Sequence, residues 1–234
     1  MKAQTLAALA AARAAHLPIA LVTRISDGAQ ALVDASGVDG ELVLDAPAVA
    51  AVRARLARAE SGMLEGDAGL FARCYVPAPR LLIVGAVHIG QALQAIATVV
   101  GYEVTVIDPR SGFAASQHFA PGQVASDWPD AAMRRLAPDA GTAVVTLTHD
   151  PKLDDPALIA ALRSPAFYIG ALGSRRTHAQ RLARLQGLGL GEELQRLHAP
   201  IGLDLGGRSA GEIAVAIMAE IVQVRCRPAA AELS

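Results

Sequence analysis

The hydrophobic pattern changes character partway along the chain. Up to about residue 75 the apolar runs are short and are separated by polar turns, which predicts a small α+β unit. The runs 19–25 and 29–33 flank Asp27-Gly28, and this arrangement favours a hairpin because glycine accepts the positive φ of a tight turn. A further strand is expected near 41–44, and Pro47 is expected to open a helix.

Beyond Pro77-Ala78-Pro79 the pattern becomes an alternation of strands and helices. Proline denies the backbone both helix and ladder hydrogen bonds, so this tripeptide predicts an extended linker between a domain at 1–76 and one at 80–234. The expected strands are uninterrupted apolar runs at 81–84, 104–107, 124–125, 143–147 and 167–169. The expected helices are 89–100, 130–136, 156–162 and 174–186. This order predicts a Rossmann-like α/β domain with a parallel sheet.

The last expected helix has a clear start and an unusual composition. Ser209 and Glu212 form a capping box, in which each side chain satisfies a free N–H of the first turn. The helix that follows is apolar around most of its circumference, so we expect it to be buried in the domain or against a second copy of the chain. A homodimer is therefore expected.

Composition narrows the class of partner. Hydrophobic residues make up 53% of the chain and charged residues only 18%, which is ample for a core, and the net charge of −1 offers no general attraction to nucleic acid or anionic membranes. No run approaches the ~20 apolar residues of a membrane span, and the first helix does not resemble a secretory signal, so a cytoplasmic protein is expected. No metal site is predicted, because neither the cysteines nor the remaining histidines show ligand spacing. These residues are Cys74, Cys226, His16, His118, His178 and His198.

The first candidate site is the segment from Gly85 to Gly90, between a strand and a helix. This is the position of the dinucleotide-binding turn, where the N–H groups of a helix N-terminus meet a phosphate. Asp108 ends the next strand, where a carboxylate reaches a ribose hydroxyl. However, Val87 stands where the middle glycine is usual, which argues against ordinary NAD binding, and His88 follows it. The alternative is a tight strand–helix turn in which Gly90 only allows close packing.

The second candidate site follows the strand at 143–147. In an open α/β sheet the strand end faces the binding crevice, so Thr148, His149 and Asp150 are available for acid–base work or for hydrogen bonds to a ligand. The alternative is that Thr148 and Asp150 only cap the loop.

The third candidate site combines Gly173 and Ser174 with Arg175 and Arg176 in the first turn of a helix. Arginines at this end oppose the helix macrodipole, at a cost of roughly 0.3–1 kcal/mol for each charge. The placement is better explained if an anion lies nearby, because guanidinium groups bind phosphate bidentately. The alternative is that the arginines face carboxylates or solvent.

Four segments in order resemble the XdhC/CoxI family, whose members are accessory proteins that mature molybdenum hydroxylases such as xanthine dehydrogenase. The segments are 81–90, 148–158, 169–176 and 200–206. The resemblance implies a protein that binds the molybdenum cofactor (molybdopterin), assists its sulfuration and inserts it into an apo-hydroxylase, with a cysteine desulfurase as a possible second partner. The phosphate or pyrophosphate of the cofactor would lie at the Gly85–Gly90 turn or at Arg175 and Arg176.

The sequence departs from the family pattern at two places. The family usually has glycine where this chain has Val87, and no Gly-Gly-Cys segment is found in the N-terminal unit, which we expect to be shortened. The sequence favours a cofactor-binding maturation factor over an enzyme and assigns no catalytic residue. Two alternatives stay open, namely an NAD(P)-dependent oxidoreductase that uses Asp108 and the His149 region, and a scaffold that binds no ligand.

Overall fold

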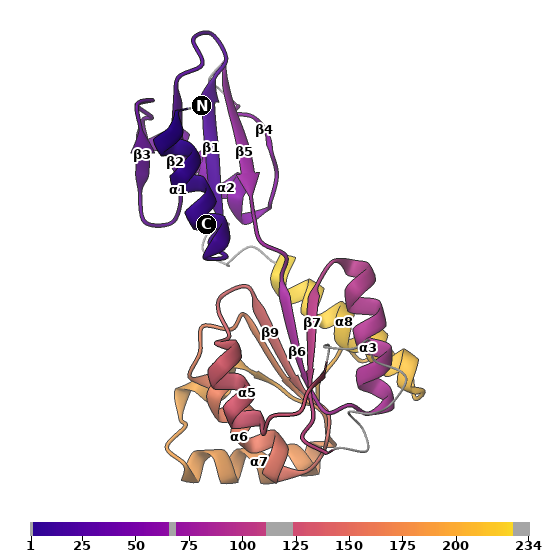
Figure 1. Cartoon of the computed structure of the whole chain (residues 1–234). Helices are drawn as coiled ribbons and strands as arrows, with labels where there is room; N and C mark the ends of the chain where they lie inside the picture. The colour runs from indigo at the N-terminus through magenta and orange to yellow at the C-terminus, as the bar shows by residue number, and fades with distance from the viewer. Residues whose placement is uncertain (1, 66–68, 111–123, 227–234) are drawn as a thin grey trace. The chain divides into compact units, whose positions relative to one another are not determined.

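The computed structural model describes residues 2–65, 69–110 and 124–226, and the chain divides into two compact units, Met1–Pro77 and Ala78–Ser234 (Figure 1). His118 lies outside the described residues. None of the helices in the described part of the chain is long and apolar enough to cross a membrane.

The N-terminal unit is an antiparallel sheet of strand order β3-β2-β1-β5-β4 with one helix on each face. Side chains alternate along β1, so Ala20 and Val22 pack with α2 while Ile19 and Leu21 pack with α1. The elements are α1 (Ala3–Ala14), β1 (Ile19–Arg24), β2 (Gln30–Val33), β3 (Val38–Gly40), α2 (Ala46–Ala57), β4 (Gly62–Met63) and β5 (Leu70–Tyr75).

The expected hairpin between the first two strands is confirmed. Strands β1 and β2 pair antiparallel, Gly28 has φ of +74°, and the Asp27 carboxylate accepts a hydrogen bond from the N–H of Ala29. Pro47 lies at the start of α2 as expected, where the N-cap Asp45 accepts from the N–H of Ala48.

The strand expected near 41–44 was wrong by a few residues. Strand β3 ends at Gly40, whose φ is +138° and whose Cβ, if present, would lie 2.6 Å from the carbonyl oxygen of Gln30. The chain leaves the sheet after Gly40, and Leu42 is buried although it lies in a loop. Strand β5 was not predicted although it pairs with β1 along six residues, because Arg73 and Cys74 interrupt its apolar alternation.

The second unit confirms the predicted Rossmann-like α/β fold. Among the described residues its sheet has six strands, all parallel, in the order β11-β10-β9-β6-β7-β8, the order of dinucleotide-binding folds. Figure 1 shows α3 and α8 on one face of the sheet and α5, α6 and α7 on the other, and a separate apolar core fills each interface. The strands are β6 (Arg80–Val84), β7 (Glu103–Ile107), β8 (Val124–Ala125), β9 (Thr142–Thr146), β10 (Tyr168–Ala171) and β11 (Leu197–His198).

One helix of this unit begins earlier than the sequence predicts. Helix α6 starts at Pro151, earlier than the expected 156, because Asp150 caps it and Pro151 suits the first helical position, so that Pro156 lies inside the helix. The 3-10 helix Glu192–Arg196 and the two-residue strand β11 were not predicted, since elements so short carry no periodic signal. The α-helices are α3 (His88–Val100), α5 (Pro129–Leu136), α6 (Pro151–Leu162), α7 (Arg175–Gly187) and α8 (Ala210–Cys226).

Helix α8 is buried along one face only. The capping box is confirmed, because the Glu212 carboxylate accepts from the N–H of Ser209 while the Ser209 hydroxyl accepts from the N–H of Glu212. Residues on the inner face pack with α3 against the sheet, whereas Val215 is 49% exposed. The dimer expected from this helix stays a prediction.

Candidate functional site

The Rossmann unit has its topological switch point between β6 and β9. The chain runs from β6 outward to β7 and β8, and then crosses back to β9 and continues to β10 and β11 on the other side. Ligands of open α/β sheets bind at the carboxyl ends of the strands at such a point. The three sequence-predicted segments follow β6, β9 and β10, so they share this edge of the sheet.

The turn after β6 is held by close backbone packing. Gly85 has φ of +114°, and a Cβ on it would lie 2.7 Å from the methyl carbon of Thr148. A Cβ on Gly90 would lie 2.6 Å from the carbonyl oxygen of Gly85. Only glycine fits at both positions, and the first two candidate segments touch here.

Helix α3 begins directly after this turn without a side-chain cap. Its N-cap is Val87, in an ordinary extended conformation with φ of −88°, and its side chain packs partly against the α3–α8 core. The conformation at Val87 therefore does not require glycine. His88 is exposed at the first helical position. The N-cap gives the first-turn N–H groups no side-chain acceptor, so among the described residues they have no cap that would compete with an anion.

Asp108 is fully buried and is occupied by the protein itself. Its carboxylate accepts hydrogen bonds from the N–H of Ala86 at 2.8 Å and from the Arg110 guanidinium at 2.9 and 2.7 Å. Burial raises the pKa of Asp108, but the bonds from Arg110 and Ala86 outweigh burial and hold that pKa below its usual value. In this conformation the carboxylate fixes the turn before α3, and both oxygens that a ribose would need are engaged.

The loop after β9 is ordered by its own polar groups. Asp150 is the N-cap of α6 and accepts from the N–H of Lys152 at 2.9 Å, and Thr148 Oγ1 accepts from the N–H of Asp150 at 3.1 Å. His149 is exposed and has φ of +61°, an uncommon conformation for a residue other than glycine. These hydrogen bonds show that Asp150 caps α6 and that Thr148 orders the loop, while ligand binding by Thr148, His149 and Asp150 stays a prediction.

The start of α7 places two arginines in solvent. Ser174 is the N-cap, and its hydroxyl accepts from the N–H of Thr177 at 3.2 Å. Gly173 has φ of +149°, which turns the chain from β10 into the helix. Arg175 and Arg176 are exposed, and neither forms an ion pair with any residue that the structure describes. The alternative with carboxylate partners is thus not seen among these residues.

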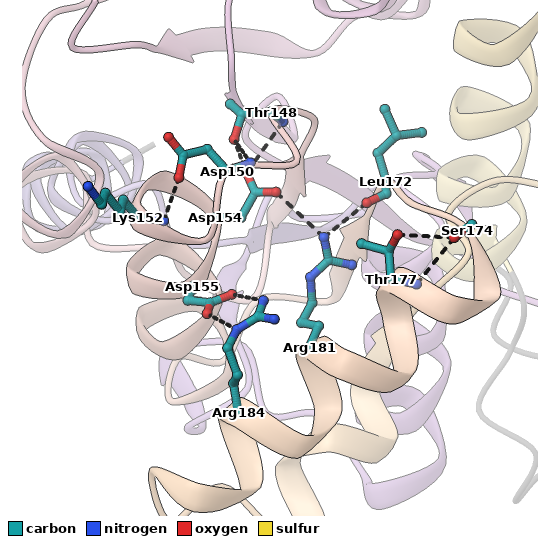
Figure 2. Close-up of polar contacts among 10 residues, drawn as sticks. All are labelled: Thr148, Asp150, Lys152, Asp154, Asp155, Leu172, Ser174, Thr177, Arg181 and Arg184. Atoms are coloured by element: carbon teal, nitrogen blue, oxygen red, sulfur yellow. Dashed lines mark hydrogen bonds and ion pairs between the residues drawn. The ribbon is translucent and has the colours of Figure 1, made fainter.

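A buried polar network that the sequence analysis missed joins these loops. Figure 2 shows Asp154, on α6, reaching both Thr148 and Arg181, which comes from α7. The Asp154 and Arg181 side chains are each only 2% exposed. Asp154 lies inside the segment 148–158 that carried the family resemblance but before the helix expected at 156–162, so its burial was not expected from the sequence.

Metal-ligating side chains do not gather at this edge. In the described ranges there is no group of three or more histidine, cysteine, aspartate or glutamate residues placed to hold a metal ion. Both cysteines are free thiols: Cys74 is half-buried, and burial raises its pKa, whereas Cys226 is exposed.

Comparison with known proteins assigns this arrangement to a family. A model of the XdhC Rossmann domain matches residues 81–221, which is more than half of the chain. The chain belongs to the XdhC family. The match covers all three loops of the candidate site, so the turn before α3, the loop after β9 and the start of α7 are parts of the XdhC Rossmann domain.

The XdhC relatives are longer proteins. The molybdenum cofactor insertion chaperone PaoD of Escherichia coli is 36% identical over 64% of this chain and 41% of its own length. A probable xanthine dehydrogenase component of Bacillus subtilis is 30% identical over 68% of this chain and 47% of its own. The crystal structure of a xanthine dehydrogenase from Bacillus halodurans superposes with a TM-score of 0.69 at 25% identity, over 98% of this chain and 66% of that one. The chain spans less than half the length of these two curated relatives.

Proposed function

We propose that this XdhC-family chain is an accessory protein that binds a molybdenum cofactor and assists its insertion into an apo-hydroxylase of the xanthine dehydrogenase family. Family membership and the similarity to an insertion chaperone support the proposal. The cofactor is cargo in this scheme, so the chain has to bind, orient and release it rather than turn over a substrate. The form of the cargo is a pyranopterin with a terminal phosphate, or a dinucleotide with a pyrophosphate.

One structural observation carries the binding site. Of the three helices that directly follow β6, β9 and β10, α6 is capped by the Asp150 carboxylate and α7 by the Ser174 hydroxyl, whereas the N-cap of α3, Val87, makes no side-chain hydrogen bond. The uncapped N–H groups of α3 lie at the switch point of the sheet. A phosphate fits there because it accepts these bonds and is attracted by the positive end of the helix dipole.

Exposed cations at the same edge add to the fit. Arg175 and Arg176 lie at the start of α7, after strand β10, and have no carboxylate partner among the described residues. In the proposed complex they neutralise the phosphate or pyrophosphate, which favours binding and offsets the cost of their position at a helix N-terminus. The net charge of the whole chain is only −1, so the chain as a whole adds no general attraction for an anion and the local arginines have to supply it.

The test is retention of the cofactor itself. The purified chain is incubated with molybdenum cofactor freshly released from a hydroxylase, unbound material is removed, and the retained pterin is quantified by fluorescence after oxidation. We expect near-stoichiometric retention. Absence of retention sinks the carrier proposal. NAD(H) binding without retention would then favour the oxidoreductase, and binding of neither ligand would favour the scaffold.

Two variants with matched controls locate the phosphate. His88→Asp places a carboxylate in the first turn of α3, which stabilises the helix by roughly 0.3–1 kcal/mol but repels an anion. We expect retention to fall at least tenfold without loss of thermal stability, while His88→Gln retains the cofactor. Changing Arg175 and Arg176 together to alanine is expected to weaken retention as well. The control changes Arg134 and Arg135, an exposed pair on α5 with surface ion pairs, and is expected to have no effect.

The finer steps belong to the same proposal. Sulfuration of the carried cofactor would require a cysteine desulfurase as a second partner, and a homodimer would cover the exposed side of α8. Pull-down of the desulfurase and sedimentation of the chain at micromolar concentration test these two points separately.

A further inference from the structure

A buried ion pair lies beneath the loops of the candidate site. Asp154 lies in the first turn of α6 and Arg181 lies on α7, and the Asp154 Oδ2 to Arg181 Nη2 distance is 3.5 Å. Each side chain is 2% exposed, so neither contacts a ligand from its present position. The two helices follow neighbouring parallel strands, β9 and β10.

Each partner of the pair also holds a loop. Asp154 Oδ1 accepts from the Thr148 hydroxyl at 2.6 Å, and Arg181 Nη2 donates to the carbonyl oxygen of Leu172 at 3.0 Å (Figure 2). Thr148 in turn lies against Gly85, whose missing side chain makes room for the threonine methyl group. A continuous chain of contacts thus links the turn before α3, the loop after β9 and the loop after β10.

Stability does not explain why this pair is charged. Burying two charges is repaid only when the geometry is good and the remaining polar atoms are hydrogen-bonded. Here Asp154 Oδ2, Arg181 Nε and Arg181 Nη1 have no hydrogen-bond partner among the described residues. Burial raises the pKa of Asp154 and lowers the pKa of Arg181, so each charged form is disfavoured by its surroundings.

A neighbouring pair on the same helices shows the contrast. Arg184 of α7 meets Asp155 of α6 through two hydrogen bonds of 2.7 and 3.1 Å, and the Arg184 side chain is 39% exposed. This outer pair ties the helices without leaving buried polar atoms unsatisfied. Attachment of α6 to α7 therefore does not account for the inner pair. Its hydrogen bonds to Thr148 and Leu172 indicate that it acts on the loops after β9 and β10.

We propose that Asp154 and Arg181 are positioning residues that fix the loops after β9 and β10 relative to the turn before α3, at the spacing needed by the anionic end of the ligand. The directional bonds to Thr148 and Leu172 set this spacing, which apolar side chains of similar size cannot do. The proposal rests on the proposed function in one respect, namely that an anionic cofactor binds at this edge.

The experiment replaces both charges together. The double variant Asp154→Leu with Arg181→Met removes the pair without leaving an uncompensated buried charge, and such replacements are often neutral or stabilising. We expect the melting temperature to be kept while cofactor retention falls at least tenfold and amide exchange in 148–150 and 172–174 speeds up at least tenfold. The matched control, Asp155→Ala with Arg184→Ala, is expected to leave both readouts unchanged.

Three outcomes would contradict the positioning role of Asp154 and Arg181. Unchanged retention or unchanged loop exchange in the double variant overturns the proposal, and so does a loss of melting temperature that accounts for the loss of binding. If the double variant fails to fold, Arg181→Lys keeps the charge but loses the planar fork, and it must weaken retention at least threefold with faster exchange at 172–174. If the wild-type chain retains no cofactor, the carrier function fails by itself, and the exchange measurement alone decides the positioning role.

Discussion

Replacement of Gly85 by alanine tests the close contact between the turn before α3 and the loop after β9. At φ of +114° an alanine is strained by roughly 1–3 kcal/mol. Its Cβ would also lie 2.7 Å from the Thr148 methyl carbon, and overpacking of this kind costs about 1–3 kcal/mol more. The total is about 2–6 kcal/mol, a large part of the stability of a typical domain.

The contact can be separated from the backbone strain. Gly101 has φ of +93°, and a Cβ on it would meet nothing within 4 Å, so Gly101→Ala carries the strain alone. Thr148→Ser removes the methyl group but keeps the hydroxyl that bonds Asp154. We expect the double variant Gly85→Ala with Thr148→Ser to be more stable than the sum of the single effects by about 1–2 kcal/mol, because the clash is gone.

Urea unfolding of the wild-type chain, the two single variants and the double variant, followed by circular dichroism, measures this coupling. In a parallel thermal scan, each kcal/mol is expected to shift the melting temperature by roughly 2–4 °C for a unit of this size. Additive effects, within about 0.5 kcal/mol, would show that Gly85 and Thr148 do not touch in solution and that the first two candidate segments are not joined.

Three further expectations concern single side chains. Asp108→Asn should weaken the dependence of the unfolding free energy on acid pH. Because the pKa of Asp108 is lowered in the folded state, the stability that its carboxylate contributes is present above about pH 4 and is lost as the pH falls through the folded-state pKa. Unfolding curves recorded between about pH 7 and 3 measure the change. Ser209→Ala should cost about 1 kcal/mol in urea unfolding because the hydroxyl that accepts from the N–H of Glu212 is lost, and a cost below about 0.5 kcal/mol would contradict that hydrogen bond. Gly187→Ala should raise stability by roughly 0.5 kcal/mol, since a Cβ there meets nothing within 4 Å and alanine favours the helix, whereas a drop in melting temperature would contradict the ordinary helical backbone at this position.

The candidate site was predictable in part because each segment has a local signature. Glycines after an apolar strand, a capping serine and a capping aspartate act within a few residues of themselves, and the structure places Gly85, Asp150 and Ser174 in such local roles. Ligand binding by these residues stays a prediction. The roles of Asp108 and Arg181 were not visible, because Asp108 is held by Ala86 after another strand as well as by the nearby Arg110, and Arg181 meets Asp154 on another helix.

The sequence alone determined the alternation of strands and helices, the parallel sheet and the edge at which the three segments meet. These features follow from hydrophobic period and from the rule that parallel strands carry their outgoing loops at one edge. Only the tertiary structure decided that Asp108 is turned toward Ala86 and Arg110, that Asp154 and Arg181 join two loops, and that α3 alone of the helices after β6, β9 and β10 lacks a side-chain cap. The physical reason is that hydrogen bonds and ion pairs between distant segments depend on distances of a few tenths of an ångström, which a pattern of residue types does not contain.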